Sequence, residues 1–270
     1  MPLTTESQII AGELPATDFL KTTGTLEAIG TLHSTLYNNG TPGAASAPVP
    51  GISGAALTSY AGQFPVPAPI AGKELALTGF SVQGSVIGTA ILADRLWHNS
   101  GISSTLTTAQ TINSVAWPAR CWDYALNGWD TDGDGINVAA EVSQATTNAA
   151  VVVITVSYTN SAGVSGRTGT ITMPATAQVG SFVPMVLQAG DRGVRSVQTI
   201  TAAAAIGGTY HLVAYRTIAR VKCTLANVTS TLAERRVKAQ LADNTVPFLL
   251  WLPSATTALT ISGDLTYSQG

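Results

Sequence analysis

The chain has 270 residues, which is enough for one large β domain or two smaller ones. Only 10% of its residues are charged, against about 25% in an average soluble protein, while Thr, Ser, Ala and Gly are abundant. The formal net charge of −2 gives no electrostatic basis for binding nucleic acid or an anionic membrane. A surface so poor in charge suggests that other subunits cover much of it. The alternative is a solitary domain that its hydroxyl groups keep soluble.

Targeting signals and cysteine pairs are not evident in the sequence. No apolar run is long enough for a membrane-spanning helix, and the start from Met1 to Glu6 lacks the basic and apolar stretches of a signal peptide. We therefore expect the protein to be made in the cytoplasm. Cys121 and Cys223 belong to no metal-spaced motif, so we expect two reduced, separately buried thiols rather than a bridge.

Apolar residues after Asp18 recur at roughly helical spacing. They are Phe19, Leu26, Ile29, Leu32 and Leu36. With Asp18 as a possible N-cap and Gly40 beyond the end, this pattern predicts an amphipathic helix over residues 18–38. Threonines and a glycine lower its helix propensity, so the apolar stripe needs a neighbour. That neighbour could be another chain, which makes Phe19 and Leu26 candidate partner-binding residues.

Residues 41–72 are rich in proline and glycine, a composition that resists both helix and central strand. We predict an extended arm, so that residues 1–72 form a helix and arm and residues 73–270 form a separate β domain. The side chains of Leu57 and Phe64 favour an arm that lies against a partner surface. A disordered tether is the alternative.

From Lys73 onward the pattern becomes strand-like, with short apolar or β-branched runs separated by Gly, Asn and Ser turns. The runs lie at 75–92, 105–117, 150–158, 168–173, 181–187, 194–201, 209–223, 246–252 and 257–267. Several short strands without a long intervening helix predict an all-β fold, specifically an antiparallel, jelly-roll-like β-sandwich. Residues 225–241 fit either a short helix or an irregular connection.

An acidic loop gives the sharpest local motif. Asp130, Asp132 and Asp134, then Gly135 and Glu141, match the calcium-loop pattern D-x-[DN]-x-[DN]-G-x₅-E. In such a loop alternate carboxylates converge on one hard cation, the residue after the glycine (here Ile136) gives its carbonyl oxygen, and the last Glu closes the site. The sequence thus offers a structural calcium site. The flanks do not look like the helices of an EF-hand, so a plain Asp/Gly turn between strands is the alternative.

Motifs for nucleophilic, nucleotide-driven or hydride-transfer chemistry are missing from the sequence, and we do not expect an enzyme. His33, His98 and His211 have no metal-spaced partners, so core or interface roles are expected. Asp94 is expected to pair with the adjacent Arg95 or to cap a turn.

Two smaller patterns concern a turn and the tryptophans. Asp191 opens a turn in which Arg192 or Arg195 could hold its carboxylate. Five tryptophans cluster partly around the acidic loop: Trp97, Trp117, Trp122, Trp129 and Trp251. We expect Trp97, Trp117 and Trp251 to be core residues. Trp122 and Trp129 flank turn residues, which makes them candidate partner-binding residues.

Several longer strings in this chain resemble a family of uncharacterised structural proteins from tailed-bacteriophage genomes. The strings are DRLWHNSGI at 94–102, TAQTINSVAWPAR at 108–120, LQAGDRGVRSV at 187–197 and HLVAYR at 211–216. The resemblance implies a virion component, located in the capsid, and it brings no catalytic residues with it.

Two structural roles fit these observations. One is a capsid cement or decoration protein whose partners are the major capsid protein and copies of itself, with a trimer expected by analogy with cement proteins. The other is a tail, baseplate or head-fibre subunit that binds host glycans through the tryptophan-rich acidic loop. A polysaccharide-cleaving enzyme is the third and weakest reading.

Overall fold

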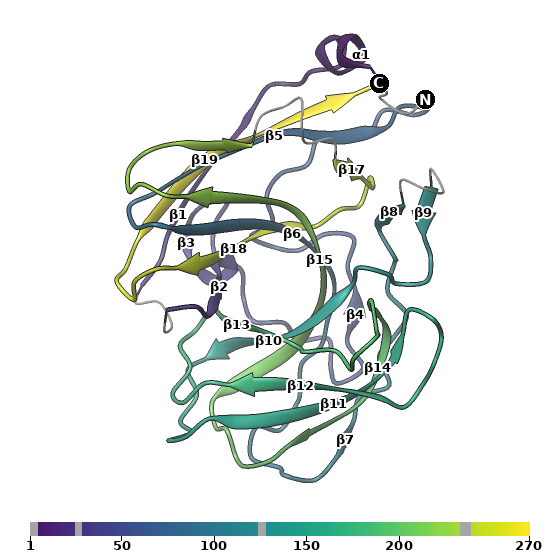
Figure 1. Ribbon diagram of the computed structural model, residues 1–270, viewed down its shortest axis with the longest axis vertical. Coiled ribbons are helices and arrows are strands. Elements are labelled where there is room, and N and C mark those ends of the chain that lie inside the picture. The colour runs from purple at the N-terminus through teal and green to yellow at the C-terminus, as the bar shows by residue number, and fades with distance from the viewer. Residues whose placement is uncertain (1–4, 25–28, 124–127, 233–238) are drawn as a thin grey trace.

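The regular secondary structure of the described chain is almost entirely antiparallel strands (Figure 1). The structure is a computed structural model that describes residues 5–24, 29–123, 128–232 and 239–270. The expected fold class, all-β with antiparallel sheets packed face to face, is confirmed. None of the described helices is long and apolar enough to cross a membrane.

The central sheet closes on itself. Its order is β15, β10, β13, β2, β18 and β6, and β6 pairs again with β15, so six strands form a closed ring. The strands are β2 (Leu32–Ser34), β6 (Gly88–His98), β10 (Asn137–Gln144), β13 (Ser181–Pro184), β15 (Thr209–Cys223) and β18 (Pro247–Pro253). A short strand, β4 (Ala55–Ala56), adds to β6 beyond the end of β18. Closure leaves no long open edge on the central sheet.

Two further sheets cover opposite parts of this ring, above and below it in Figure 1. The first contains β1 (Thr17–Thr22), β3 (Asn39–Thr41), β5 (Leu75–Gly84), β16 (Ser230–Leu232), β17 (Ala239–Leu241) and β19 (Thr260–Gln269). The second contains β7 (Gln110–Thr111), β11 (Val152–Asn160), β12 (Arg167–Met173) and β14 (Val194–Ala202). A small two-stranded sheet, β8 (Cys121–Asp123) with β9 (Gly128–Asp130), stands to one side.

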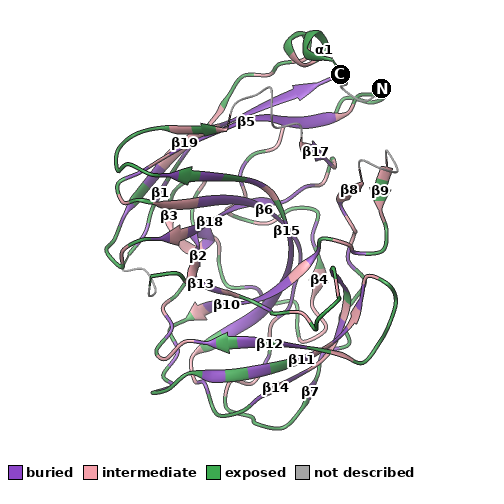
Figure 2. Ribbon diagram, in the orientation of Figure 1, coloured by how far each residue is buried: buried purple, intermediate pink, exposed green. Residues whose placement is uncertain are grey.

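Alternating side chains of the ring strands supply three separate cores. On β6, Leu92 faces the first covering sheet and Leu96 faces the second, while Ile91 points into the ring. This follows from the two-residue period of a strand, which sends successive side chains to opposite faces. Figure 2 shows the same alternation as buried and exposed segments along β11. Trp97, Trp117 and Trp251 are buried as expected.

The helix predicted over residues 18–38 is wrong. Residues 17–22 form β1, in which Phe19 and Lys21 are buried and alternate with exposed neighbours, and β2 follows after the turn. A single 3-10 turn, η1 (Thr35–Tyr37), lies within the predicted range. The short α-helix α1 (Glu6–Ala11) lies upstream, capped by Thr5, and has no buried residue.

Residues 1–72 do not form an independent arm. β1 pairs with β19 near the C-terminus, and β2 lies between β13 and β18 in the closed ring. The proline-rich segment after β3 also packs on the fold, because Phe64 N–H donates to the Pro247 carbonyl and Leu57 N–H donates to the Leu96 carbonyl. The expected boundary between 1–72 and 73–270 therefore separates strands that pair with one another in the same sheets.

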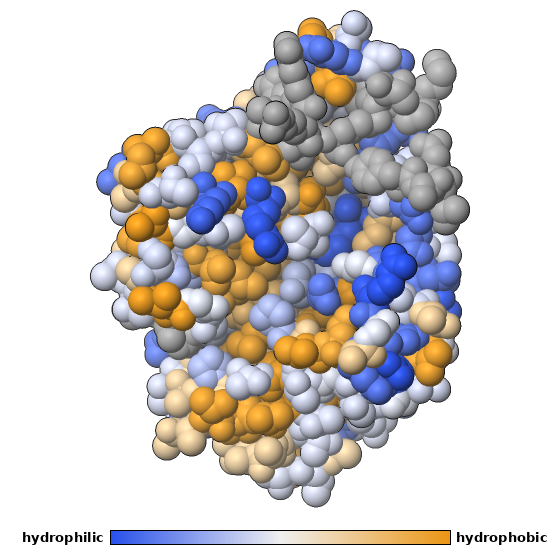
Figure 3. All heavy atoms as spheres, viewed as in Figure 1, coloured by the Kyte–Doolittle hydropathy of each residue, from blue (hydrophilic) through white to orange (hydrophobic). Residues whose placement is uncertain are grey.

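Much of the surface is neutral. In Figure 3, pale residues of intermediate hydropathy separate orange and blue patches. Several charged side chains do not contribute to the surface because they are buried: Lys21, Asp94, Arg95, Arg120, Glu141 and Arg216. Large apolar side chains are exposed instead, among them Val49 at 92% and Val186 at 68%.

Candidate functional site

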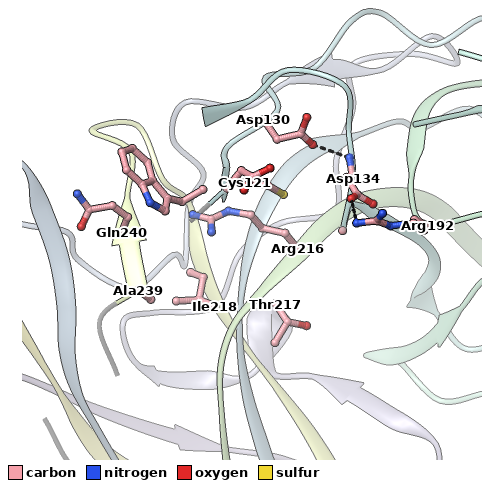
Figure 4. A pocket seen from close by; sticks show the side chains of 12 residues that line it. Cys121, Asp130, Asp134, Arg192, Arg216, Thr217, Ile218, Ala239 and Gln240 are labelled. Atoms are coloured by element: carbon pink, nitrogen blue, oxygen red, sulfur yellow. Dashed lines mark hydrogen bonds and ion pairs between the residues drawn. The ribbon is translucent and has the colours of Figure 1, made fainter. Parts of the chain in front are cut away.

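The acidic loop borders a cavity of about 630 Å³ beside β8 and β9. Its walls come from β8, β9, the loop, the middle of β15 and β17. The lining residues are Cys121, Trp122, Asp123, Asp130, Asp134, Gly135, Arg192, Arg216, Thr217, Ile218, Ala239 and Gln240. Figure 4 shows Arg216 reaching into this space from β15 toward Gln240, with Cys121 above its side chain in this view. Burial raises the pKa of the Cys121 thiol to about 11, so it stays protonated.

The side-chain carboxylate of Asp130 holds the acidic loop by accepting hydrogen bonds from the loop's backbone. Its Oδ1 accepts a hydrogen bond from Asp132 N–H at 2.8 Å, and its Oδ2 accepts one from Asp134 N–H at 2.6 Å. Gly133 and Gly135 have φ values of 86° and 77°, which L side chains rarely adopt. The remaining two carboxylates are paired with arginines across the loop, Asp132 with Arg195 and Asp134 with Arg192.

The five residues predicted to bind calcium are not brought together. Glu141 lies within β10 and its Oε2 pairs with Arg95 inside the ring. The Ile136 carbonyl accepts the N–H of Val194 at 3.0 Å. In the described part of the chain, no three His, Cys, Asp or Glu side chains are grouped so that they could hold a metal ion. The geometry is that of the alternative, an Asp/Gly turn.

We expect the melting temperature to be the same in chelator and in millimolar calcium, because Arg192 and Arg195 already neutralise two loop carboxylates. Differential scanning fluorimetry of the wild type and of Asp132→Ala measures this. A calcium-dependent rise in melting temperature that disappears in Asp132→Ala would contradict this and show that the loop binds calcium.

A second charged cluster lies directly behind the cavity. Asp94 accepts hydrogen bonds from Arg120 Nε at 3.0 Å and Nη2 at 2.9 Å, from Arg216 Nε at 3.2 Å and from Val246 N–H at 2.8 Å. The expectation that Asp94 pairs with Arg95 is therefore wrong, because adjacent residues of β6 point to opposite faces. Arg216 is 7% exposed and lines the cavity, and its Nη2 has no hydrogen-bond partner among the described residues.

The third cluster fills one end of the ring. Glu141 Oε2 accepts from Arg95 Nη2 at 2.7 Å and from Tyr37 Oη at 3.0 Å, and lies 2.8 Å from His211 Nε2. Burial alone would raise the pKa of Glu141, but the charge of Arg95 and the hydrogen bond from His211 outweigh it and hold that pKa well below its usual range. Burial lowers the pKa of His211, so its imidazole stays neutral.

The free energy of unfolding is expected to fall as the pH drops from about 6.5 toward 3. Burial, and then the charge of Arg95, lowers the pKa of His98 from 6.5 to about 3, and His98 Nδ1 accepts from Arg95 Nε at 3.2 Å. In this window the unfolded chain holds a proton on His98 that the folded chain lacks. Unfolding takes up that proton, so stability falls by about 1.4 kcal/mol per pH unit per group.

Urea unfolding at a series of pH values measures this dependence. The variant His98→Gln keeps an acceptor for Arg95 but cannot titrate, so its free energy of unfolding should fall less steeply with decreasing pH. Equal slopes for wild type and variant would contradict this assignment.

Three of the predicted partner-binding residues lie in the core and not on the surface. Phe19 and Phe64 are 3% and 1% exposed, with ring centroids 4.9 Å apart, and Leu57 is buried as well. Leu26 lies outside the described residues. Trp122 and Trp129 do meet at the cavity's edge, with ring centroids 5.1 Å apart and Trp129 39% exposed.

The two arginines of the cluster behind the cavity, Arg120 and Arg216, were not predicted from the sequence as site residues. One signal was available, because Arg216 stands inside the long apolar run of 209–223 and a cation in such a strand needs a buried partner. The carboxylate of Asp191 is also held by a different residue than expected. Arg167 Nε donates to it at 2.9 Å, and Tyr158 Oη at 2.5 Å.

Comparison with known proteins adds little to this geometry. No family model and no curated protein matches the chain. A VP2 subviral particle of infectious bursal disease virus is similar at a TM-score of 0.21 and 7% identity, over 95% of this chain and 81% of that one. The structure of the Gt strain of the same virus gives 0.19 and 10%, over 96% and 81%. Scores this low carry no argument about fold or function.

Proposed function

We propose that this chain is a structural subunit of a tailed-bacteriophage virion, a cement or decoration protein that covers contacts between neighbouring capsid subunits, and that it catalyses no reaction. The proposal is carried by the neutral surface. A chain with so few charges that also buries several of them leaves little repulsion to oppose close packing between subunits. The resemblance of the four sequence strings supports the same class.

The outer face of the four-stranded sheet illustrates this surface. Its side chains carry hydroxyl groups in register across three strands. Thr155 lies opposite Thr170 and Thr201, and Ser157 lies opposite Thr168 and Thr199. These side chains are exposed or half-buried. Such an uncharged face can pack against another subunit without the cost of burying unpaired charge.

A lysine at Thr155 is expected to leave folding intact and to block incorporation into particles. The site is exposed, so the free energy of unfolding should change by no more than about 0.5 kcal/mol. Burying the new ammonium group against a neighbour costs several times that amount. Thr155→Ser is the matched control. Particles assembled in the presence of each variant are purified, and the bound copies are counted by quantitative mass spectrometry.

Normal incorporation of Thr155→Lys would remove this face from the proposal. Sedimentation of the free protein tests the wider idea, because a cement protein is expected to self-associate, with a trimer as the expected form. A protein that stays monomeric at high concentration and incorporates nowhere would contradict it.

A second candidate function is host-glycan binding by a tail, baseplate or fibre subunit, and the cavity beside the acidic loop favours it. It combines the indole of Trp122, the amide of Gln240 and the Nη2 of Arg216, which has no partner within the part of the chain that the structure describes. Aromatic faces beside planar polar groups suit a sugar ring. Glycan arrays and competition of phage adsorption by excess free protein test this. Binding that Trp122→Ala abolishes would favour it, and no binding with no competition would exclude it.

A further inference from the structure

A second cavity, of about 610 Å³, opens at the end of the ring opposite to the Arg95 and Glu141 cluster. Its floor is apolar and includes Ile91, Phe182 and Leu252. Phe182 lies 5.0 Å from Tyr215 and 5.9 Å from Phe248, measured between ring centroids, so aromatic rings fill the interior below it. A ligand would therefore lie across the mouth of the ring and not inside it.

Two cations stand at the rim of this mouth. β15 has a register shift between Thr217 and Ala219, after which Arg220 pairs with Ile91 and Lys222 with Thr89. The shift turns Arg220 and Lys222 toward the same side as Ile91, where both line the cavity. Figure 3 shows strongly hydrophilic side chains over this half of β15, beside an apolar area.

These cations have no counter-charge among the described residues. The side chains of Arg220 and Lys222 are exposed, and neither takes part in an ion pair or a side-chain hydrogen bond within the described chain. Among the described residues that line the cavity, none is Asp or Glu. Two cations above an apolar floor attract an anion that also has an apolar part. The neighbouring cavity beside the acidic loop differs, since there Asp134 pairs with Arg192.

We propose that the mouth of the ring binds a small carboxylate with an apolar body. Arg220 would hold the carboxylate through its planar fork of N–H donors, and Lys222 would add a second positive charge. The apolar body would cover Ile91, Phe182 and Leu252. The volume lies in the range of small-molecule sites, which are mostly apolar with a few placed polar groups. The site adjoins the proposed subunit contact at Thr172, which lies on the same exposed face of β12 as Thr168 and Thr170, but its two cations and its apolar floor come from other strands.

Decanoate, kept below its micelle-forming concentration, is the probe. Isothermal titration of the full-length protein is expected to give saturable binding of one decanoate per chain. The double variant Arg220→Gln/Lys222→Gln should bind at least about tenfold more weakly, because both charge-assisted contacts are lost. Thr172→Trp, an exposed lining position on β12, should also weaken binding by placing an indole over the floor. Lys73→Gln, an exposed lysine outside this cavity, is the matched control and should bind as the wild type does.

The neutral analogue 1-decanol separates the contribution of charge from that of hydrophobic contact. It is expected to bind more weakly than decanoate. Melting curves of each variant confirm that it is folded. The proposal is overturned by any of three results: no saturable decanoate binding, equal affinity in the folded double variant, or decanol binding as tightly as decanoate.

Discussion

Deleting residues 1–72 is expected to abolish cooperative folding. The deletion removes β2 from the closed ring and β1 from the sheet that covers it, so β13, β18 and β19 each lose a paired neighbour. It also removes Phe19, Leu36 and Phe64 from the core. Truncating one buried aromatic or leucine side chain typically costs about 2–5 kcal/mol. The loss of all three is comparable to the total of about 5–15 kcal/mol that stabilises most domains.

Circular dichroism in the aromatic region and urea unfolding of the truncated protein measure this. Deleting residues 1–11 is the control, because α1 buries no residue, and it should leave a cooperative transition. A truncation at residue 73 that still unfolds cooperatively would show that the first 72 residues are an appendage after all.

Glu141→Gln is expected to cost about 3–5 kcal/mol, the second large effect. The substitution keeps the shape of the side chain but leaves the guanidinium of Arg95 buried without its counter-charge. Arg95 and Glu141 are both 0% exposed, so solvent cannot compensate for the loss. The surface pair of Asp132 and Arg195 is the matched comparison, and Asp132→Asn should cost no more than about 1 kcal/mol.

A double-mutant cycle completes this test. The double variant Arg95→Met/Glu141→Leu removes both charges. It should lose less stability than the single variants Arg95→Met and Glu141→Leu lose in sum, because no unpaired charge remains. Urea unfolding gives all four free energies. Additive losses would mean that Arg95 and Glu141 are not energetically coupled.

The strands could be predicted from the sequence where the apolar pattern is local and long. Residues 209–223 form β15 with the predicted bounds, and 168–173 falls within β12. The helix predicted over 18–38 was wrong because its apolar residues fit both the helical and the strand period. Phe19 lies on a strand with alternating burial, and Leu32 begins another strand. Closure of the ring could not be predicted, since it joins residues near 33 to residues near 251.

Little of the candidate site could be predicted. Trp122 and Trp129 lie in contact beside the acidic loop, and their role in binding a partner stays a prediction. The calcium motif failed because a sequence pattern does not show which way a strand residue points, and Glu141 points into the ring. The partner of Asp94 was missed for a related reason. Its partners, Arg120 and Arg216, come from segments far away in the chain.

The most direct test of the proposed function is a cryo-electron microscopy reconstruction of the phage particle that contains this chain. We predict ordered density for the chain on the capsid shell, in many copies set by the shell's symmetry, with the uncharged face of β11, β12 and β14 covered by a neighbouring subunit. Density confined to the tail or a fibre would contradict the cement role. Absence of the chain from the purified particle would contradict the virion role altogether.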